Sequence, residues 1–65
     1  MNKRLIDVKE LSEYIGVKIN TIYSWVNMRQ VPYVKMGGLL KFDLKDIDTW
    51  IDKKKVKVFK YKEIV

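Results

Sequence analysis

Five uncharged polar side chains lie close together between residues 20 and 27: Asn20, Thr21, Tyr23, Ser24 and Asn27. At 100° per residue they form a continuous arc on one side of a helix. Asn can form two hydrogen bonds with adenine, Ser and Thr can bond to base edges, and a Tyr hydroxyl can hold a phosphate. The alternative is a solvated helix face, but such faces are usually built from Glu, Lys and Gln, which are better helix formers. The arc therefore favours contact with bases in duplex DNA.

Four cationic side chains lie near this arc or shortly after it in the chain: Lys18, Arg29, Lys35 and Lys41. Lys18 and Arg29 flank the ends of the expected helix, where long cations can reach phosphates. Lys35 and Lys41 fall in a later segment, which we expect to touch the DNA backbone or the minor groove. Lys18 or Arg29 taken singly is equally consistent with an ordinary surface charge.

The composition excludes most catalytic and metal chemistry. The chain has 65 residues, 14 Lys or Arg against 8 Asp or Glu, a net charge of +6, and neither Cys nor His. Most nucleophile, general-base and transition-metal sites need Cys or His, so we expect no enzyme activity, no cofactor and no small-molecule substrate. The acids Asp43, Asp46, Asp48 and Asp52 have the wrong spacing for a metal cluster. We expect them on a bracing helix that faces away from DNA.

Nothing in the chain predicts a membrane segment. The basic start at Met1–Arg4 runs directly into Leu5 and Ile6 without the apolar stretch of a signal peptide. No later apolar run approaches the ~20 residues that span a bilayer. We therefore expect a cytoplasmic protein.

Two short helices must position the arc. A first helix is expected from about Val8 to Ile15, because Asp7 can cap it and Gly16 can end it. A second helix is expected from about Lys18 to Met28, with Ile19, Ile22, Trp25 and Val26 as its apolar side. Two helices joined by a tight turn form a helix-turn-helix, which places its second helix in the DNA major groove, although other helical hairpins share this outline.

A β-hairpin and a third helix are expected next. Gly37-Gly38 separates two β-favouring runs, 33–36 and 39–42, and suits the positive φ values of a two-residue turn. In this register Met36 opposes Leu39, Lys35 opposes Leu40, Val34 opposes Lys41 and Tyr33 opposes Phe42. We expect the core to cover Leu39, in preference to its being an exposed wedge. The third helix is expected from Leu44 to about Lys53, and both Trp25 and Trp50 are expected in the core.

The C-terminal residues differ in composition from the rest. Six lysines and no acid occupy positions 53–62, with apolar residues between them. A frayed, solvated end is one reading, but the β-favouring content favours contact with a partner or a second copy. The expected contact residues are Val56, Val58, Phe59 and Tyr61. We therefore divide the chain into a domain at residues 1–53 and a basic tail at residues 54–65.

Five segments in a fixed order form a specific combination: VKELSEYIGV at 8–17, TIYSWV at 21–26, VPYVKMGG at 31–38, LKF at 40–42 and DIDTWI at 46–51. In this combination the chain resembles the excisionase-family helix-turn-helix domains, which are similar to the DNA-binding heads of MerR-type regulators. The resemblance covers about residues 5–53. Such domains commonly carry Ser or Thr followed by Arg at the start of the second helix, where this chain has Lys18-Ile19, and Arg at the hairpin tip, where it has Leu39.

The resemblance implies a mainly α fold with a small β-hairpin, a winged helix-turn-helix whose hairpin is the wing. It also implies either of two roles: steering a site-specific recombinase toward excision of a mobile element, or regulating transcription. We expect a non-catalytic, sequence-specific protein that binds double-stranded DNA, with adjacent copies of itself or a recombinase as possible partners. The alternative is a protein-interaction adaptor whose tail docks a recombinase, repressor or replication protein.

Overall fold

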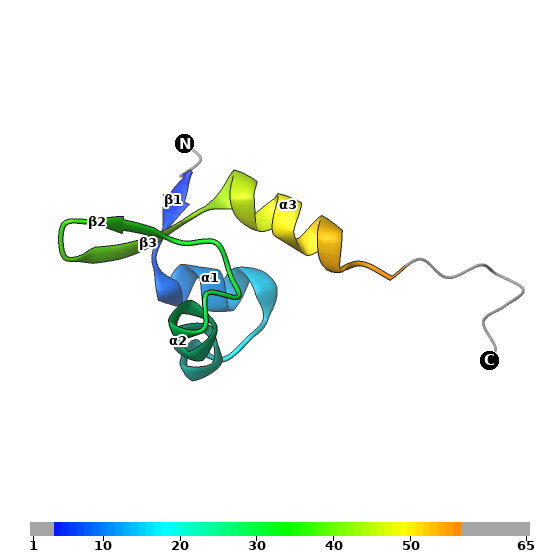
Figure 1. Ribbon diagram of the computed structural model, residues 1–65, viewed down its shortest axis with the longest axis horizontal. Helices are drawn as coiled ribbons and strands as arrows, with labels where there is room; N and C mark the ends of the chain where they lie inside the picture. Colours follow the sequence, from blue (N-terminus) through cyan, green and yellow to red (C-terminus); the bar gives the residue numbers. More distant parts are fainter. Residues whose placement is uncertain (1–3, 57–65) are drawn as a thin grey trace, which may run out of the picture.

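The computed structural model describes residues 4–56 (Figure 1). The elements follow in the order β1 (Leu5–Ile6), α1 (Val8–Ile15), α2 (Ile19–Asn27), β2 (Val34–Met36), β3 (Leu39–Asp43) and α3 (Leu44–Lys54). This order confirms the expected mainly α fold with a small hairpin, a winged helix-turn-helix. The third helix ends at Lys54, one residue later than the sequence pattern predicts.

Local hydrogen bonds define both ends of α1. The carboxylate of Asp7 accepts from the backbone N–H of Glu10 at 2.8 Å, and the Glu10 carboxylate accepts from the Asp7 N–H at 3.0 Å. This reciprocal capping box confirms the predicted start. At the other end Gly16 has φ +70°, a conformation that favours glycine. The Ser12 hydroxyl donates to the Val17 carbonyl at 2.6 Å and holds the turn that leads into α2.

The hairpin has the predicted register in its paired part, where Val34 faces Lys41, Lys35 faces Leu40 and Met36 faces Leu39. At the tip only Gly37, with φ +62°, has the positive φ expected of both glycines. A strand that the sequence analysis did not predict completes the sheet.

That additional strand, β1, pairs antiparallel with β3, so the sheet order is β1-β3-β2. Leu5 lies opposite Asp43 and Ile6 opposite Phe42. The backbone N–H of Leu44 also donates to the Arg4 carbonyl at 2.8 Å. The N-terminal strand thus joins the sheet where β3 passes into α3.

One core holds buried apolar side chains from all three helices, from the strands β1 and β3, and from the segment between α2 and β2. The buried set is Ile6, Leu11, Ile22, Val31, Phe42 and Ile47. Trp25 and Trp50 were expected in the core but lie at its margin, half-buried and packed against it. Their rings meet edge to face, with centroids 5.7 Å apart.

The expectation that the core covers Leu39 is wrong. Leu39 is 61% exposed because the hairpin tip projects beyond the helices (Figure 1). Alternation along β3 places Phe42 and Leu40 on the face that contacts the core, and Leu39 on the opposite face. Sequence alternation alone does not say how far the core extends along a hairpin.

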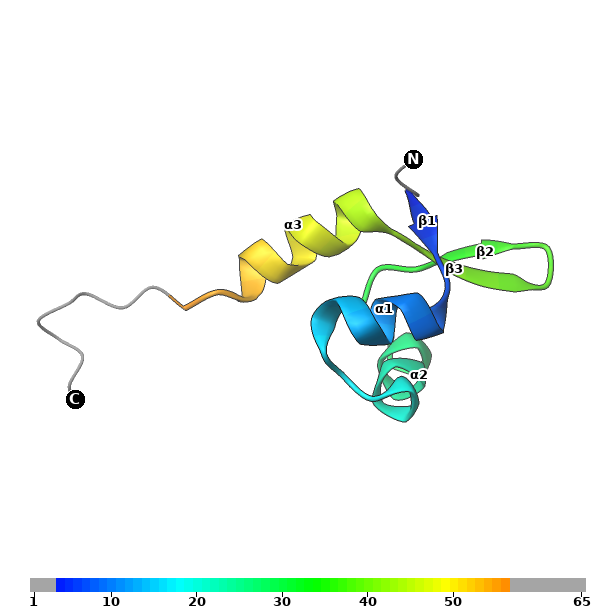
Figure 2. The ribbon, with the colours of Figure 1, turned by 180° about the vertical axis from the view of Figure 1, so that it is seen from behind.

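Side-chain bonds fix α3 to the rest of the domain. Asp43 caps it by accepting from the Lys45 N–H at 2.9 Å, as its position before the helix predicts. The Trp50 indole Nε1 donates to the carbonyl of Gln30 at 3.0 Å, and the Tyr14 hydroxyl donates to Asp48 at 2.6 Å. Seen from behind, α3 runs away from the hairpin (Figure 2). This placement suits the bracing role expected of the helix.

Candidate nucleic-acid interface

The predicted polar arc forms one solvent-facing side of α2. Asn20, Tyr23, Ser24 and Asn27 are exposed, and Thr21 is half-buried. The opposite side of the helix is anchored by Ile22, which has no exposed surface. Anchoring of this kind limits rotation of the helix about its own axis. The structure therefore brings all five arc residues together on one exposed surface, here called the α2 face.

Lys18 and Arg29 occupy the two ends of α2, and both are exposed. Lys18 is the N-cap residue, and its side chain forms no cap hydrogen bond. Backbone N–H groups in a first helical turn are common anion ligands, so a phosphate at this end would meet both the helix terminus and the Lys18 ammonium.

Arg29 follows Met28, the C-cap residue of α2, and lies in the left-handed region with φ +55°. The Arg29 N–H donates to the Val26 carbonyl at 3.0 Å, and the Gln30 N–H donates to the Trp25 carbonyl at 2.8 Å. These two bonds form a Schellman motif, in which glycine is the usual residue at the left-handed position. The backbone here accommodates an arginine at a position that disfavours it.

The two hairpin lysines lie on opposite faces of the wing. Cross-strand partners share a face, so Lys41 lies with Val34, while Lys35 lies with Leu40. Lys35 is exposed and Lys41 is half-buried. In both ribbon views the hairpin projects on the side of the molecule opposite the end of α3, and α2 lies next to α1 (Figures 1 and 2).

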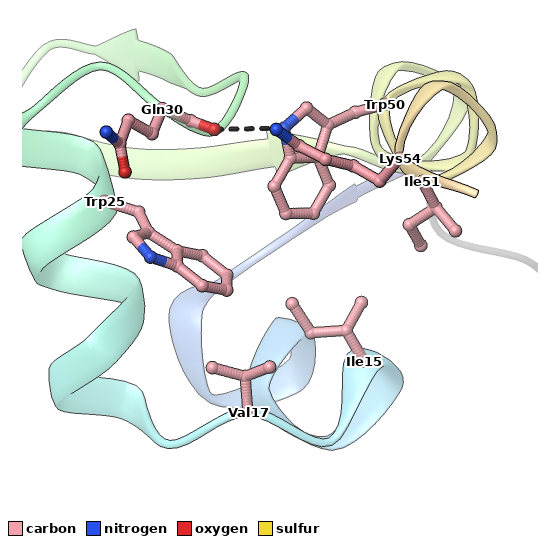
Figure 3. Close-up of a pocket in the computed structure, with 7 residues that line it drawn as sticks. All are labelled: Ile15, Val17, Trp25, Gln30, Trp50, Ile51 and Lys54. Atoms are coloured by element: carbon pink, nitrogen blue, oxygen red, sulfur yellow. Dashed lines mark hydrogen bonds between the residues drawn. The ribbon is translucent and has the colours of Figure 1, made fainter. Parts of the chain in front are cut away.

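A groove of about 510 Å³ lies between the α1–α2 turn, the end of α2 and α3 (Figure 3). Its lining residues are Ile15, Val17, Trp25, Gln30, Trp50, Ile51 and Lys54. The Lys54 ammonium lies 5.7 Å from the centre of the Trp50 ring, within cation–π range. This groove was not predicted from the sequence, because both tryptophans were expected in the core. Two large aromatics on neighbouring apolar stripes of a very small domain were the available signal.

The predicted contact residues of the tail are only partly described. Val56 is 83% exposed. Val58, Phe59 and Tyr61 lie outside the described residues, so their contact role stays a prediction. Within residues 4–56, no group of three or more acidic side chains is placed to hold a metal ion.

The side chains whose pKa values are shifted take part in hydrogen bonds that stabilise the fold. The hydrogen bond from the Arg4 guanidinium lowers the pKa of Asp43, and the backbone N–H of Lys45 lowers it further against the opposing effect of burial. The hydrogen bond that Tyr14 donates to Asp48 raises the pKa of the tyrosine. Both pairs involve α3 or its cap, and neither involves the α2 face. Three of the four acids considered as a metal cluster, Asp43, Asp48 and Asp52, are thus engaged in side-chain contacts.

Comparison with known proteins bears on the whole domain. The family model described as a helix-turn-helix domain matches residues 5–55, which cover β1 through α3. No curated protein and no solved structure matches the chain. In the part of the chain that the structure describes, no helix has the length and apolar character needed to cross a bilayer. From its match over residues 5–55 and its winged arrangement of elements, the chain belongs to the excisionase-like helix-turn-helix family and is a DNA-binding helix-turn-helix protein.

Proposed function

We propose that the protein binds a specific double-stranded DNA sequence without catalysis, with α2 in the major groove and the hairpin as its wing. The observation that carries this proposal is the α2 face: five uncharged hydrogen-bonding side chains share one surface, opposite the fully buried Ile22. Uncharged donors and acceptors discriminate base edges, whereas cations mainly bind phosphates. Base recognition is therefore assigned to Asn20, Thr21, Ser24 and Asn27, and a phosphate contact to Tyr23.

Phosphate contacts fix the register of the complex. Lys18 immediately precedes α2 and Arg29 lies two positions after its last residue, and the nine helical residues between them rise about 14 Å. Two cations at this separation can bind phosphates on the two rims of the major groove, which is about 12 Å wide. Lys35 and Lys41 on the wing supply the remaining backbone contacts. The acids of α3 belong to a helix that runs away from the hairpin (Figure 2), which supports the expectation that they face away from the duplex.

The biological role that fits this chemistry is an excisionase-like directionality factor or a small transcriptional regulator of a mobile element. A single module of this size buries about 600–1,000 Å² on DNA, at the low end for specific complexes. Such a module gains discrimination from neighbours that bind the same duplex. Adjacent copies of the chain or a recombinase are the partners proposed here.

Selection from a random duplex pool tests the proposal. The wild-type protein is expected to enrich one short sequence. Asn20→Ala and Thr21→Ala should relax the preference at single positions, with a loss of about 1–3 kcal/mol of discrimination for each bidentate contact removed. Lys41→Ala should weaken all sequences alike. If Asn20, Thr21 and Ser24 can all become Ala without changing the enriched sequence, the assignment of the α2 face is wrong.

The groove supports a second candidate function, a protein-interaction adaptor. Trp25, Trp50 and Ile51 offer an apolar surface away from the α2 face (Figure 3). Aromatic pockets of this kind anchor protein partners. Ile51→Asp places a charge in the groove, so it should leave binding to an isolated DNA site unchanged while it abolishes co-purification with a recombinase or repressor. If Ile51→Asp weakens DNA binding and leaves co-purification with the recombinase or repressor unchanged, the adaptor function is wrong.

A further inference from the structure

The tip of the wing is apolar. Met36 and Leu39 face each other across the Gly37-Gly38 turn and are 49% and 61% exposed. Both lie outside the set of apolar residues that form the core or pack against it. A single exposed leucine on a protein surface is ordinary. Here two large apolar side chains are cross-strand neighbours at the most projecting part of the domain (Figure 1).

The surroundings of this tip indicate what it meets. Lys35 and Lys41 each lie within two residues of it along a strand, on opposite faces of the hairpin. The minor groove of duplex DNA is about 6 Å wide and is bounded by two phosphate backbones. Met36 and Leu39 share the Lys41 face of the hairpin, so a wing tip that turns this face toward the bases brings the apolar pair to the base edges and Lys41 beside a phosphate. Neither Gly37 nor Gly38 has a side chain, so the turn itself is narrow enough to enter.

We propose that the wing tip enters the minor groove and that Leu39 inserts between two base pairs there, with Met36 packed beside it. The inference rests on the proposed function, because α2 must first place the domain on a duplex. Apolar side chains inserted at a base step unstack it partially and bend the duplex toward the major groove. Pyrimidine–purine steps unstack most easily, so the protein reads such a step through deformability and without hydrogen bonds.

The geometry also predicts that affinity is a poor measure of the wedge. Removing the Leu39 side chain loses its apolar contact with the bases, but it also restores the stacking that insertion disrupts. The two effects oppose each other, so overall affinity changes little. Base unstacking and duplex bending depend directly on whether Leu39 is inserted, so these are the quantities to measure.

The test uses the full chain and the duplex enriched from the random pool. 2-Aminopurine replaces one base at a time beside the segment bound by α2, and fluorescence anisotropy measures binding of the same duplexes. Wild type is expected to raise the 2-aminopurine emission severalfold at one step, and energy transfer between dyes on the duplex ends should report a bend. Leu39→Ala should bind but lose both signals, and Leu39→Ile should keep them. Leu39→Arg should bind more tightly at low salt, because it adds a phosphate contact, and should show no unstacking.

The outcomes separate the wedge from the proposed function. Binding by wild type with unchanged 2-aminopurine emission at every position overturns the wedge alone. An absence of duplex binding even at low salt overturns the proposed function and the wedge together. If Leu39→Ala keeps the unstacking signal but no longer fills adjacent sites cooperatively, the tip contacts a second copy and the wedge is wrong. Position 39 is exposed, so the variants should keep the far-ultraviolet circular dichroism of wild type.

Discussion

The residues at the ends of α2 stabilise a helix less well than the residues at the ends of α1. At α1, Asp7 forms a capping box and Gly16 takes the left-handed position, which are the residue types that stabilise helix ends best. At α2 the corresponding positions hold Lys18 and Arg29, a cation without a cap bond and a non-glycine at φ +55°. Local stability is thus lower than it could be at both ends of α2. Residue types that are unfavourable for the local backbone conformation are common at functional sites.

Replacing these two cations should therefore raise stability and lower DNA affinity. Arg29→Gly relieves the left-handed arginine and should stabilise the domain by about 1 kcal/mol. Lys18→Ser introduces an N-cap hydrogen bond and should add a similar amount, about 1 kcal/mol. Each should weaken duplex binding and reduce the salt slope by about 0.9. Urea unfolding and anisotropy titrations measure the two effects.

The matched control for the cap variants is Asp7→Ala. It removes the α1 cap and should cost about 1 kcal/mol of stability while DNA affinity stays unchanged. Stabilised Lys18 and Arg29 variants that bind DNA as well as wild type would show that neither cation contacts a phosphate.

At the scale of elements, β1 ties the N-terminus to the start of α3. The Arg4 guanidinium contacts the Asp43 carboxylate through Nε at 2.9 Å and Nη2 at 2.8 Å, and the same carboxylate caps α3. Asp43 is only 7% exposed, whereas the Arg4 side chain is largely in solvent. One acid therefore joins a strand and a helix that are far apart in the sequence.

Arg4→Gln should destabilise the protein at neutral pH and make it no less stable than wild type in acid. The pKa of Asp43 lies below the ordinary value of about 3.9, so the contact stabilises the fold above roughly pH 4 and is lost as pH falls through the folded-state pKa. Without Arg4 that pKa should rise. Urea unfolding at neutral and acid pH, with carboxyl carbon chemical shifts for Asp43, measures both. A stability difference that persists unchanged in strong acid contradicts the assignment.

What could be predicted from sequence depended on whether a local signal existed. Asp7 and Gly16 fixed the ends of α1, and the glycine pair fixed the hairpin register. The strand Leu5–Ile6 has only two residues, too few to show an alternation of apolar and polar side chains. Its stability comes from pairing with a strand almost forty residues away. The position of Leu39 was mispredicted because burial depends on where the helices stop. The polar arc was predicted correctly as a surface because the apolar residues opposite it repeat at helical spacing.

At the scale of the whole molecule, the net charge of +6 predicts that DNA binding depends strongly on salt. The cations proposed to contact DNA, together with the tail lysines, can neutralise about four to seven phosphates. The slope of log K against log salt concentration should then be about −4 to −6. Anisotropy titrations over a series of salt concentrations measure it. A flat titration would favour the adaptor function over DNA binding.

Truncation after Lys55 tests the division between domain and tail. The described core draws only on residues up to Ile51, so the truncated chain should fold and bind an isolated site. It should lose cooperative filling of adjacent sites or recruitment of its partner, because the proposed contact residues at 56, 58, 59 and 61 are removed. Gel-shift titrations on one-site and multi-site duplexes, with and without a recombinase, measure this. Unfolding of the truncated chain would place the tail within the core.

The edge-to-face contact of Trp25 with Trp50 also gives the protein an optical signature. The chain has two tryptophans, and their ring centres lie 5.7 Å apart at an interplanar angle of 61°. Indole transitions this close and this inclined couple as excitons and produce a paired positive and negative band in circular dichroism. Trp25 belongs to α2 and Trp50 to α3, so the band pair reports the docking of one helix against the other. Movement of α3 relative to α2 can therefore be followed on the unlabelled protein.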